Sequence, residues 1–577
     1  MKKTIFTVVL LVLSLSLINA SSLSQQLYDA TDREYIETIM LCQASGVLGP
    51  SAVTPITGEE LIIALDRIDK NTLSDRQKSI YESLYASLGS YYEKASLEFF
   101  TDISPTVFLT DRYEGNFSRD DYYAIDYKDE RPGVDIGAVA TYGKNIVIEG
   151  SYPLINTELK NKGVYLTSLD WLINFRNGTV NTFGGKDKSM MNRDQLPDNA
   201  RGSIGNEYIN LAFGRTKHSM GSGFTGNLMI GDNFRYQEVA KFTLMGNWMT
   251  YNISLTHFDQ QLGKDQMQYP AFGGMHQTRV VHRMDINIKN VARVAVNLGT
   301  LYQADSAFDI RFLTPFIISH HYYNFADSQI INDNPIVKDE ANNIFGIEIE
   351  VSPIKNLKIT MQGVLDQFQL PTENQDALPM AMGGLLNASY AFYKDDYRLS
   401  MWAEGVYTMP YLYLNFKKDK VETIKDGNIV VSYVPNYNYD FIFGYTRREN
   451  WNKDLDDIAF SGYPSGPDTI VAALGFDYMN YDINLRLFGF LKYQAHGEQG
   501  FNTDSFEGFQ DKKTPSGVPE TMIAAHLGFS WQALPNLEAF GGAQLTCFKN
   551  FGNIEGEKLN KMQGYIGFTW RYSSLSK

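Results

Sequence analysis

The chain ends on a segment that alternates between apolar and polar residues almost to its last position. The apolar positions are aromatic or branched, and small, polar or charged residues separate them: Ile566, Phe568, Trp570 and Tyr572 against Gly567, Thr569 and Arg571. Because successive side chains of a β-strand point to opposite faces, this segment has one apolar face and one wet face. A soluble sandwich would keep its inner face dry and would not present a row of aromatic residues outside. The pattern therefore predicts a strand that crosses a membrane.

The same alternation returns elsewhere in the chain. Three further segments show it: Phe345, Ile347, Ile349 and Val351 against Glu348 and Glu350; Tyr439, Phe441, Phe443 and Tyr445; and Ile483, Leu485 and Leu487 against Asn484 and Arg486. The charges opposite the apolar faces predict a solvated lumen. The repetition of such strands predicts an all-β transmembrane barrel.

The first residues predict a signal peptide over positions 1–20. Lys2 and Lys3 precede an apolar run, and small residues follow that run. No later run of about 18 apolar residues occurs, so strands are the expected means of spanning a membrane. The net charge of -15 argues against nucleic acid as a partner. We expect an outer-membrane location, with membrane lipid as the first partner.

Residues 23–95 have a helical pattern. Three pairs have the spacing of a capping box, in which a hydroxyl and an acid or amide satisfy the free amides at a helix start: Thr31 with Glu34, Thr57 with Glu60, and Ser74 with Gln77. They predict three short helices. Because so small a bundle can barely form a core of its own, we expect it to dock on the barrel mouth as a periplasmic cap or plug.

Short turns and long polar connections alternate from residue 96 to 577, the range predicted for the barrel. The turns carry glycine, proline or asparagine: 143–145, 177–178, 246–247, 289–290, 353–356, 394–395, 479–480 and 535–536. Short turns at one end and long loops at the other are typical of bacterial outer-membrane barrels, and their number predicts about 16 to 18 strands. The wall of such a barrel cannot fill its own interior, which then holds water or folded-in loops.

The segment from Leu211 to Asn233 is rich in glycine. Continued alternation would place Arg215 beside Leu211 and Phe213, so we predict that the strand ends or bulges near Arg215. The glycines that follow permit positive φ and close backbone approach. This predicts a chain that folds tightly inside the barrel or at its rim.

This segment resembles the Wzi family of outer-membrane capsule-assembly proteins, in which a Gly-Arg pair precedes a Trp-Gly-Pro-Gly turn and a run ending in small polar residues. The matching positions are Gly214, Arg215, Gly221, Gly223, Gly231, Asp232 and Asn233, whereas Met220 replaces the tryptophan and Ser222 the proline. A looser similarity passes through Asp366. The resemblance implies an 18-stranded barrel with periplasmic helices and surface loops that hold exopolysaccharide. The candidate polysaccharide-binding residues are Arg215, His218, Gly221, Gly223, Asp232, Asn233 and Asp366.

Several alternatives remain at the level of sequence. Residues 35–68 resemble the surface-layer-homology repeat, and this resemblance suggests cell-wall polymer as a further partner. The chain departs from the repeat at Gly58, where the repeat carries a basic residue. No spacing predicts a metal site, no carboxylate pair stands out for glycoside hydrolysis, and we expect neither a cofactor nor enzyme activity. The rival function is a diffusion porin, which would need an open, charged constriction, whereas a polysaccharide-binding barrel can fill its bore.

Overall fold

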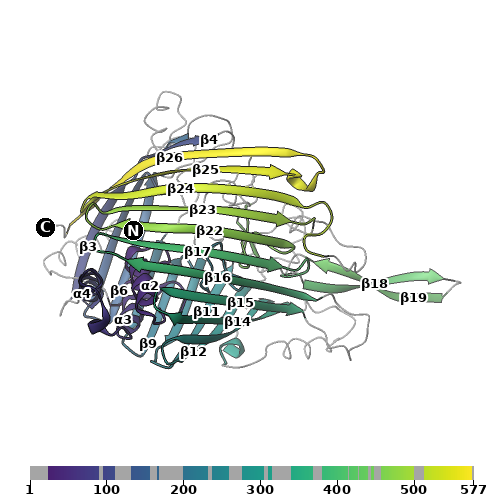
Figure 1. The fold of residues 1–577 in the computed structure, drawn as a ribbon. Helices are drawn as coiled ribbons and strands as arrows, with labels where there is room; N and C mark the ends of the chain where they lie inside the picture. Colours follow the sequence, from purple (N-terminus) through teal and green to yellow (C-terminus); the bar gives the residue numbers. More distant parts are fainter. Residues whose placement is uncertain are drawn as a thin grey trace, which may run out of the picture.

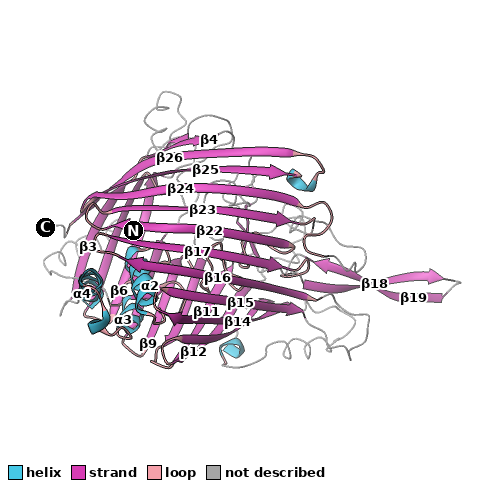
Figure 2. Ribbon diagram, viewed as in Figure 1, coloured by secondary structure: helices cyan, strands magenta, loops and turns pink. Residues whose placement is uncertain are grey.

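Strands between residues 95 and 573 close into an antiparallel barrel (Figures 1 and 2). The computed structural model describes residues 24–89, 95–110, 131–155, 166–167, 199–231, 237–258, 276–304, 310–314, 340–367, 380–413, 415–425, 428–438, 444–447, 457–498 and 513–574. Within these ranges the wall has 18 strands, since β3 and β4 run along β26 as one interrupted strand and β7 is a two-residue bridge on β4. The predicted fold class is confirmed.

The barrel is built from segments in near-sequential order. They are β3 (Ala95–Ile103), β4 (Thr106–Thr110), β5 (Val134–Tyr142), β6 (Ile146–Ile155), β7 (Leu166–Thr167), β8 (Asn199–Gly205), β9 (Ile209–Thr216), β10 (Gln237–Leu244), β11 (Met249–Phe258), β12 (His276–Ile288), β13 (Ala292–Ala304), β14 (Glu340–Ile354), β15 (Leu357–Gln367), β16 (Ala381–Tyr393), β17 (Tyr397–Thr408), β22 (Thr469–Asn480), β23 (Leu485–His496), β24 (Glu520–Leu534), β25 (Leu537–Lys549) and β26 (Lys558–Ser573). The last strand closes the ring, because Trp570 pairs with Ile103 and Ile566 with Val107.

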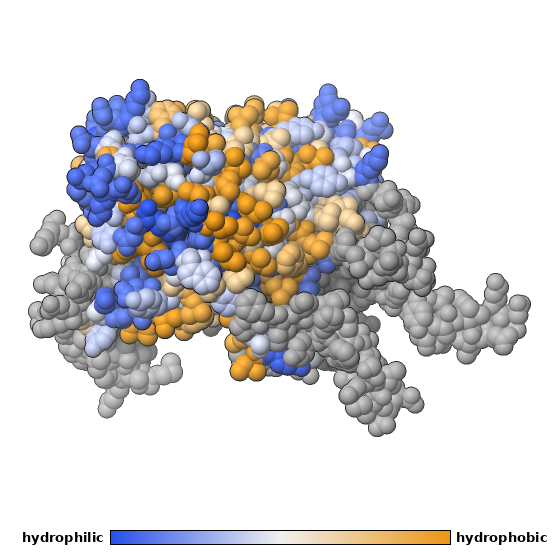
Figure 3. All heavy atoms as spheres, turned by 60° about the horizontal axis from the view of Figure 1, so that its bottom comes forward, coloured by the Kyte–Doolittle hydropathy of each residue, from blue (hydrophilic) through white to orange (hydrophobic). Residues whose placement is uncertain are grey.

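The outer face of the wall is apolar. Ile566 and Phe345 are 59% and 44% exposed, whereas Glu348, on the opposite face of the strand that carries Phe345, is 2% exposed. Figure 3 shows hydrophobic residues gathered across the middle of one side of the barrel and hydrophilic residues towards its ends. A belt of this kind is the surface that a lipid bilayer covers. Among the helices that the structure describes, none is both long and apolar enough to cross a membrane.

Short turns join the strands at one end of the barrel. They lie at 143–145, 206–208, 245–248, 289–291, 355–356, 394–396, 481–484 and 535–536. The turn at 206–208 was not predicted, the one expected at 479–480 lies slightly later, and 177–178 falls outside the described residues. The first wall strand, β3, also begins at this end, and the last, β26, ends there. Chain ends and short turns lie together in this way at the periplasmic end of bacterial outer-membrane barrels.

One predicted membrane strand is wrong. Residues 444–447, which include Tyr445, form β20 in a separate two-stranded sheet with β21 (Asp457–Phe460), and residues 439–443 lie outside the described ranges. The wall passes directly from β17 to β22. A second hairpin, β18 (Asn415–Lys425) with β19 (Asn428–Asn438), extends away from the barrel (Figure 1). Alternation alone could not separate a membrane strand from a hairpin in a long loop.

The N-terminal residues 24–89, which we call the cap, hold three α-helices. These are α2 (Arg33–Ser45), α3 (Gly58–Leu65) and α4 (Asp75–Gly89), with the 3₁₀ turn η1 (Lys70–Thr72) and the short pair β1 (Leu27–Tyr28) and β2 (Ile56–Thr57). Capping boxes open α3 at Thr57 and α4 at Ser74, as predicted. At α2 the prediction is one residue early, because Asp32 is the N-cap and its carboxylate accepts the Asp29 amide instead of an amide of the helix.

The cap lies against the short-turn end of the barrel (Figure 1). Backbone bonds join Leu48 N to Asn290 O and Asn356 N to Gln43 O, both at 2.9 Å. The Arg76 guanidinium lies 2.8 Å from the Asp482 carboxylate. Ser24 of the cap also donates to the Lys144 carbonyl at 3.0 Å, and Arg76 to the Asp395 carbonyl. The cap thus contacts at least five of the short turns at this mouth.

Candidate functional site

Residues 217–231, which we call the luminal segment, fold back from the end of β9 into the barrel. Met220 forms antiparallel bridges with Val53 of the cap on one side and with Ile230 on the other. The Gly221 amide donates to the Ala52 carbonyl at 2.8 Å, and the Gly231 amide donates to the Ser461 carbonyl at 2.6 Å. The luminal segment is therefore tied both to the cap and to the connection that precedes β22.

An apolar core fills the lumen around this segment. It joins the luminal segment and the cap to inward-facing wall residues and to the connection between β17 and β22: Val53, Met220, Leu228, Met229, Ile230, Val281, Leu301, Ile344, Val364, Leu385, Val406, Leu412, Tyr413, Tyr463, Val471 and Ala473. Met220, which replaces the tryptophan of the resembled family, is 1% exposed within this core. Its position serves packing in this protein.

Carboxylates of the inner wall hold the luminal segment. Glu404 on β17 accepts the amides of Phe224 and Thr225, each at 2.7 Å. The Phe224 ring stacks on Trp402 of the same strand at 4.6 Å between centroids and 6° between planes. Glu348 accepts the Ser222 amide at 3.2 Å. Three residues are thus fixed by the wall, whereas the Gly223 amide between them donates to Asn227 of the luminal segment itself at 2.8 Å.

An ion network lies behind these contacts. Arg283 is within 2.8 Å of both Asp285 and Glu348, and Arg293 lies 3.8 Å from Glu350. These side chains are buried, so the expectation that Glu348 and Glu350 are solvated lumen charges is wrong. Folded-in chain has displaced the water, and arginines with backbone amides replace it as partners.

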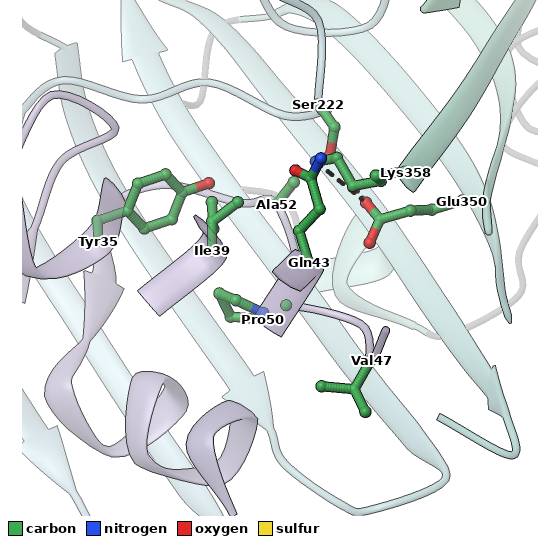
Figure 4. Close-up of a pocket in the computed structure, with 10 residues that line it drawn as sticks. Tyr35, Ile39, Gln43, Val47, Pro50, Ala52, Ser222, Glu350 and Lys358 are labelled. Atoms are coloured by element: carbon green, nitrogen blue, oxygen red, sulfur yellow. Dashed lines mark hydrogen bonds and ion pairs between the residues drawn. The ribbon is translucent and has the colours of Figure 1, made fainter. Parts of the chain in front are cut away.

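A small cavity remains where the cap, the luminal segment and the wall meet (Figure 4). Its volume is about 10 Å³, enough for about one water molecule. Gln43 of the cap, Ser222 of the luminal segment, and Glu350 and Lys358 of the wall line it. The Ser222 hydroxyl donates to Glu350 at 3.1 Å. A space of this size suits a bridging water and is too small for a sugar.

The structure brings four of the seven candidate residues together. Arg215 ends β9 near Glu238, with 3.8 Å between guanidinium and carboxylate, and the strand stops at Thr216, as predicted. His218, Gly221 and Gly223 belong to the luminal segment. Asp366 is half-buried near the end of β15, outside the luminal segment, and Asp232 and Asn233 lie outside the described residues.

Backbone geometry explains the two glycines. Gly221 has φ of +128°, a conformation that side chains disfavour. At Gly223 a Cβ atom would lie 1.8 Å from the Gly226 carbonyl oxygen. Both positions therefore require glycine for tight folding, as the sequence suggested.

His218 is buried and serves as a hydrogen-bond donor. Its Nδ1 lies 2.5 Å from the Thr54 carbonyl, which can only accept, so the proton is on Nδ1. Burial, followed by the positive charge of Arg279, lowers the pKa of His218 to about 3. The ring is therefore neutral at physiological pH and joins the luminal segment to the cap.

This environment predicts a loss of stability in acid. Because the folded pKa lies below the unfolded value of about 6.5, the contribution of His218 is complete above pH 6.5 and declines as the pH falls towards 3. Between pH 7 and 5 we expect a loss of about 2 kcal/mol in the free energy of unfolding. Urea unfolding followed by tryptophan fluorescence measures it. The variant His218→Asn keeps a donor without a charge, and an equal loss in that variant would contradict the assignment.

The residues that the sequence did not single out are those of the wall that receive the luminal segment. Two of them accept amides of the luminal segment: Glu404, and Gln362, which accepts the Leu228 amide at 3.1 Å. The third, Trp402, stacks on the segment through its ring. Each residue occupies an inward position of an alternating strand, and this position was the feature of the sequence from which a role in the lumen could have been predicted. In the described part of the chain no group of three or more His, Cys, Asp or Glu residues is placed to hold a metal ion.

Comparisons with known proteins agree on the fold. No protein-family model and no curated protein sequence matches this chain. Its structure is similar to Wzi of Escherichia coli, an outer-membrane protein involved in group 1 capsule assembly and named as a carbohydrate-binding β-barrel, with a TM-score of 0.52, 12% identity, and 95% of this chain and 99% of that chain covered. The similarity to OprD of Pseudomonas aeruginosa is lower, with a TM-score of 0.36, 7% identity, and 84% of this chain and 97% of that chain covered. The channel DcaP of Acinetobacter baumannii has a TM-score of 0.33 and 9% identity, with 83% of this chain and 98% of that chain covered. The chain has the fold of an outer-membrane β-barrel.

Proposed function

We propose that this protein resides in the outer membrane, where it binds or anchors a surface polysaccharide without covalent chemistry, as a Wzi-like barrel. The observation that carries the proposal is the filled lumen. An apolar core, a buried ion network and the cap occupy the space that a diffusion porin leaves to water. Among the residues that the structure describes, folded chain occupies the centre of the lumen, where a porin keeps an open, charged constriction.

The similarity to Escherichia coli Wzi supports the same direction. That protein is named as a carbohydrate-binding barrel, and the two chains match over nearly their full lengths. At 12% identity the match concerns the fold, so the activity is carried over here as part of the proposal. A signal peptide over residues 1–20 would supply export, and those residues lie outside the described part of the chain.

The candidate residues take a positioning role in this proposal. His218 is 1% exposed and Arg215 is 9% exposed, so neither side chain offers much surface to a polymer outside the barrel. With Gly221 and Gly223 they set the path of the luminal segment. Asp366, near the end of β15, and Asp232 and Asn233, which follow the luminal segment in sequence, remain the candidates for direct contact.

Cell-wall polymer is not retained as a partner. Gly58, which stands where the surface-layer-homology repeat carries a basic residue, is buried at the start of α3, and its amide donates to the Gln26 carbonyl at 3.1 Å. The comparisons add no support for such a partner.

The test is retention of polysaccharide by the native cell. Deleting the gene should release surface polysaccharide into the medium, and expression of the intact chain should restore the cell-bound fraction, which a lectin or antibody measures by flow cytometry. Uptake of small solutes serves as the control, because the porin alternative predicts that uptake falls while retention stays constant. That opposite pattern would contradict the proposal.

A further inference from the structure

Aromatic rings lie flat on the inner wall on the side formed by β23–β26 and β3. Each of four rings faces a glycine on the neighbouring strand in direct register: Phe488 and Gly528, Tyr565 and Gly542, Phe540 and Gly567, and Phe100 and Gly137. A Cβ atom on these glycines would come within 2.1 to 2.7 Å of the ring or its hydroxyl. The rings thus rest over the glycines on the inner face of the wall, where the His526 ring lies beside Phe488 and Tyr565.

Arginines lie over three of these rings. The guanidinium carbons of Arg131, Arg486 and Arg571 are 4.1, 5.1 and 5.0 Å from the ring centroids of Phe540, Phe488 and Phe100. Their side chains are 41%, 34% and 60% exposed. Phe488, Tyr565 and Phe100 are partly exposed, whereas Phe540 is only 4% exposed beneath Arg131. The rings and arginines together, which we call the aromatic wall, therefore offer three partly exposed rings and three exposed guanidinium groups to solvent.

Each arginine of the aromatic wall also has a carboxylate partner. Arg131 lies 2.8 Å from Glu538, and the other two pairs, Arg486 with Asp477 and Arg571 with Asp102, are each 2.5 Å apart. Three positive groups are matched by three negative ones. Glu98 and Asp135 also act on Arg571, and Asp477 also pairs with Arg398. The surface therefore offers hydrogen-bond donors and acceptors beside aromatic rings and carries no net positive charge.

The filled side of the lumen shows what such a ring does when chain covers it. Trp402 lies over Gly475 in the same arrangement, and the Phe224 ring stacks on its lumen face. On the aromatic wall, half-exposed arginines take the place of Phe224. A cation over a ring at an exposed site is held weakly, so a better partner for the ring face can displace it.

The aromatic wall starts close to the short-turn mouth. Phe540 and Phe488 are each three residues beyond the first residue of their strands, and Arg571 is two residues before the last residue of β26. The cap bonds the turns at 143–145, 289–291, 355–356, 394–396 and 481–484. The last of these borders β23, but none of them borders β25 or β26. The wall is thus placed to meet molecules that arrive from this end.

We propose that the aromatic wall binds a segment of neutral oligosaccharide that enters from the short-turn mouth, an inference that rests on the proposed function. Flat rings bury the apolar faces of sugars, while guanidinium and carboxylate groups bond their hydroxyls. A surface without net positive charge favours a neutral sugar over an acidic one. The barrel then contacts its polysaccharide, or a precursor of it, on the inner face as well as outside.

Calorimetric titration of the full-length protein in detergent with maltohexaose tests this inference. Phe488→Leu and Tyr565→Leu keep apolar bulk over the glycines but remove the flat face, and each should weaken binding about tenfold, or about 1.4 kcal/mol. Tyr565→Phe keeps the ring and should bind within about threefold of the unchanged protein. Circular dichroism and heat-dependent gel mobility establish that each variant is folded.

Three results would overturn the inference: no binding of maltohexaose by the unchanged protein, equal binding by the folded leucine variants, or tighter binding of a hyaluronan hexasaccharide, which is acidic. None of these outcomes decides whether cells retain surface polysaccharide. The retention measurement on cells that carry Phe488→Leu or the unchanged chain answers that question separately. Normal retention by both, with no binding of maltohexaose, would leave the proposed function standing and remove the aromatic wall from it.

Discussion

A barrel without its cap and luminal segment should conduct ions, whereas the intact protein should not. Thr216 and Gln237 are direct partners across β9 and β10, so a short hairpin turn can replace residues 217–236 without a change of register. Combined with deletion of residues 24–89, this change removes the centre of the apolar core and every bond that the cap makes. A barrel of 18 strands is wide enough for an aqueous channel once it is emptied.

Planar-bilayer recording measures the effect. The double deletion should give discrete current steps that the intact protein lacks, and each single deletion should give smaller steps, because the two elements close the lumen together. Removal of the hairpin at residues 415–438, which extends away from the barrel, is a matched control and should leave the membrane insulating. Large steps from the intact protein would favour the porin alternative instead.

Replacement of Arg283 by methionine should destabilise the protein strongly. The guanidinium bonds Asp285 at 2.8 Å and Glu348 at 2.7 Å, and all three side chains are at most 2% exposed. Removal of the guanidinium leaves two buried carboxylates without this partner. Such a change lowers the free energy of unfolding by about 3 to 5 kcal/mol. Urea unfolding in lipid vesicles should show a loss of this size, and Glu348→Gln added to Arg283→Met should recover part of it.

Arg76→Met is the control for this loss. Arg76 pairs with Asp482 at a similar distance of 2.8 Å, but the two side chains are 30% and 60% exposed. Exposed pairs of this kind contribute about 0 to 1 kcal/mol. Equal losses for Arg283→Met and Arg76→Met would mean that the ion network in the lumen is hydrated, and that the lumen is less filled than we describe.

The sequence predicted the membrane face of the barrel far better than its interior. Alternation identified strands such as β14 and β26, because lipid imposes an apolar residue at every second position. It missed β8, where Asn199–Gly205 places small residues such as Ala200 and Gly202 on the outer face. A strand of small residues carries too little apolar contrast to be distinguished from a loop.

The interior could be predicted only in part. The glycines after Arg215 correctly indicated a tightly folded segment, since positive φ and close approach leave a local mark in the sequence. The partners of that segment left no such mark. In the sequence Glu404 looks like any other lumen-facing charge. It accepts the Phe224 amide only because the fold brings in a residue 180 positions away in the chain. Long-range contacts of this kind decide whether a lumen charge meets water or chain.

A disulfide trap tests most directly the claim that the lumen is filled by the luminal segment. Val53 and Met220 are antiparallel bridge partners, a spacing at which paired cysteines can join. In a Cys547→Ala background, Val53→Cys with Met220→Cys should form a disulfide in intact membranes and give a mobility shift that a reductant reverses. Val53→Cys with Ile523→Cys, on the outer face, should not. Failure of the Val53 and Met220 pair to cross-link in the folded barrel would place the luminal segment elsewhere and contradict the account.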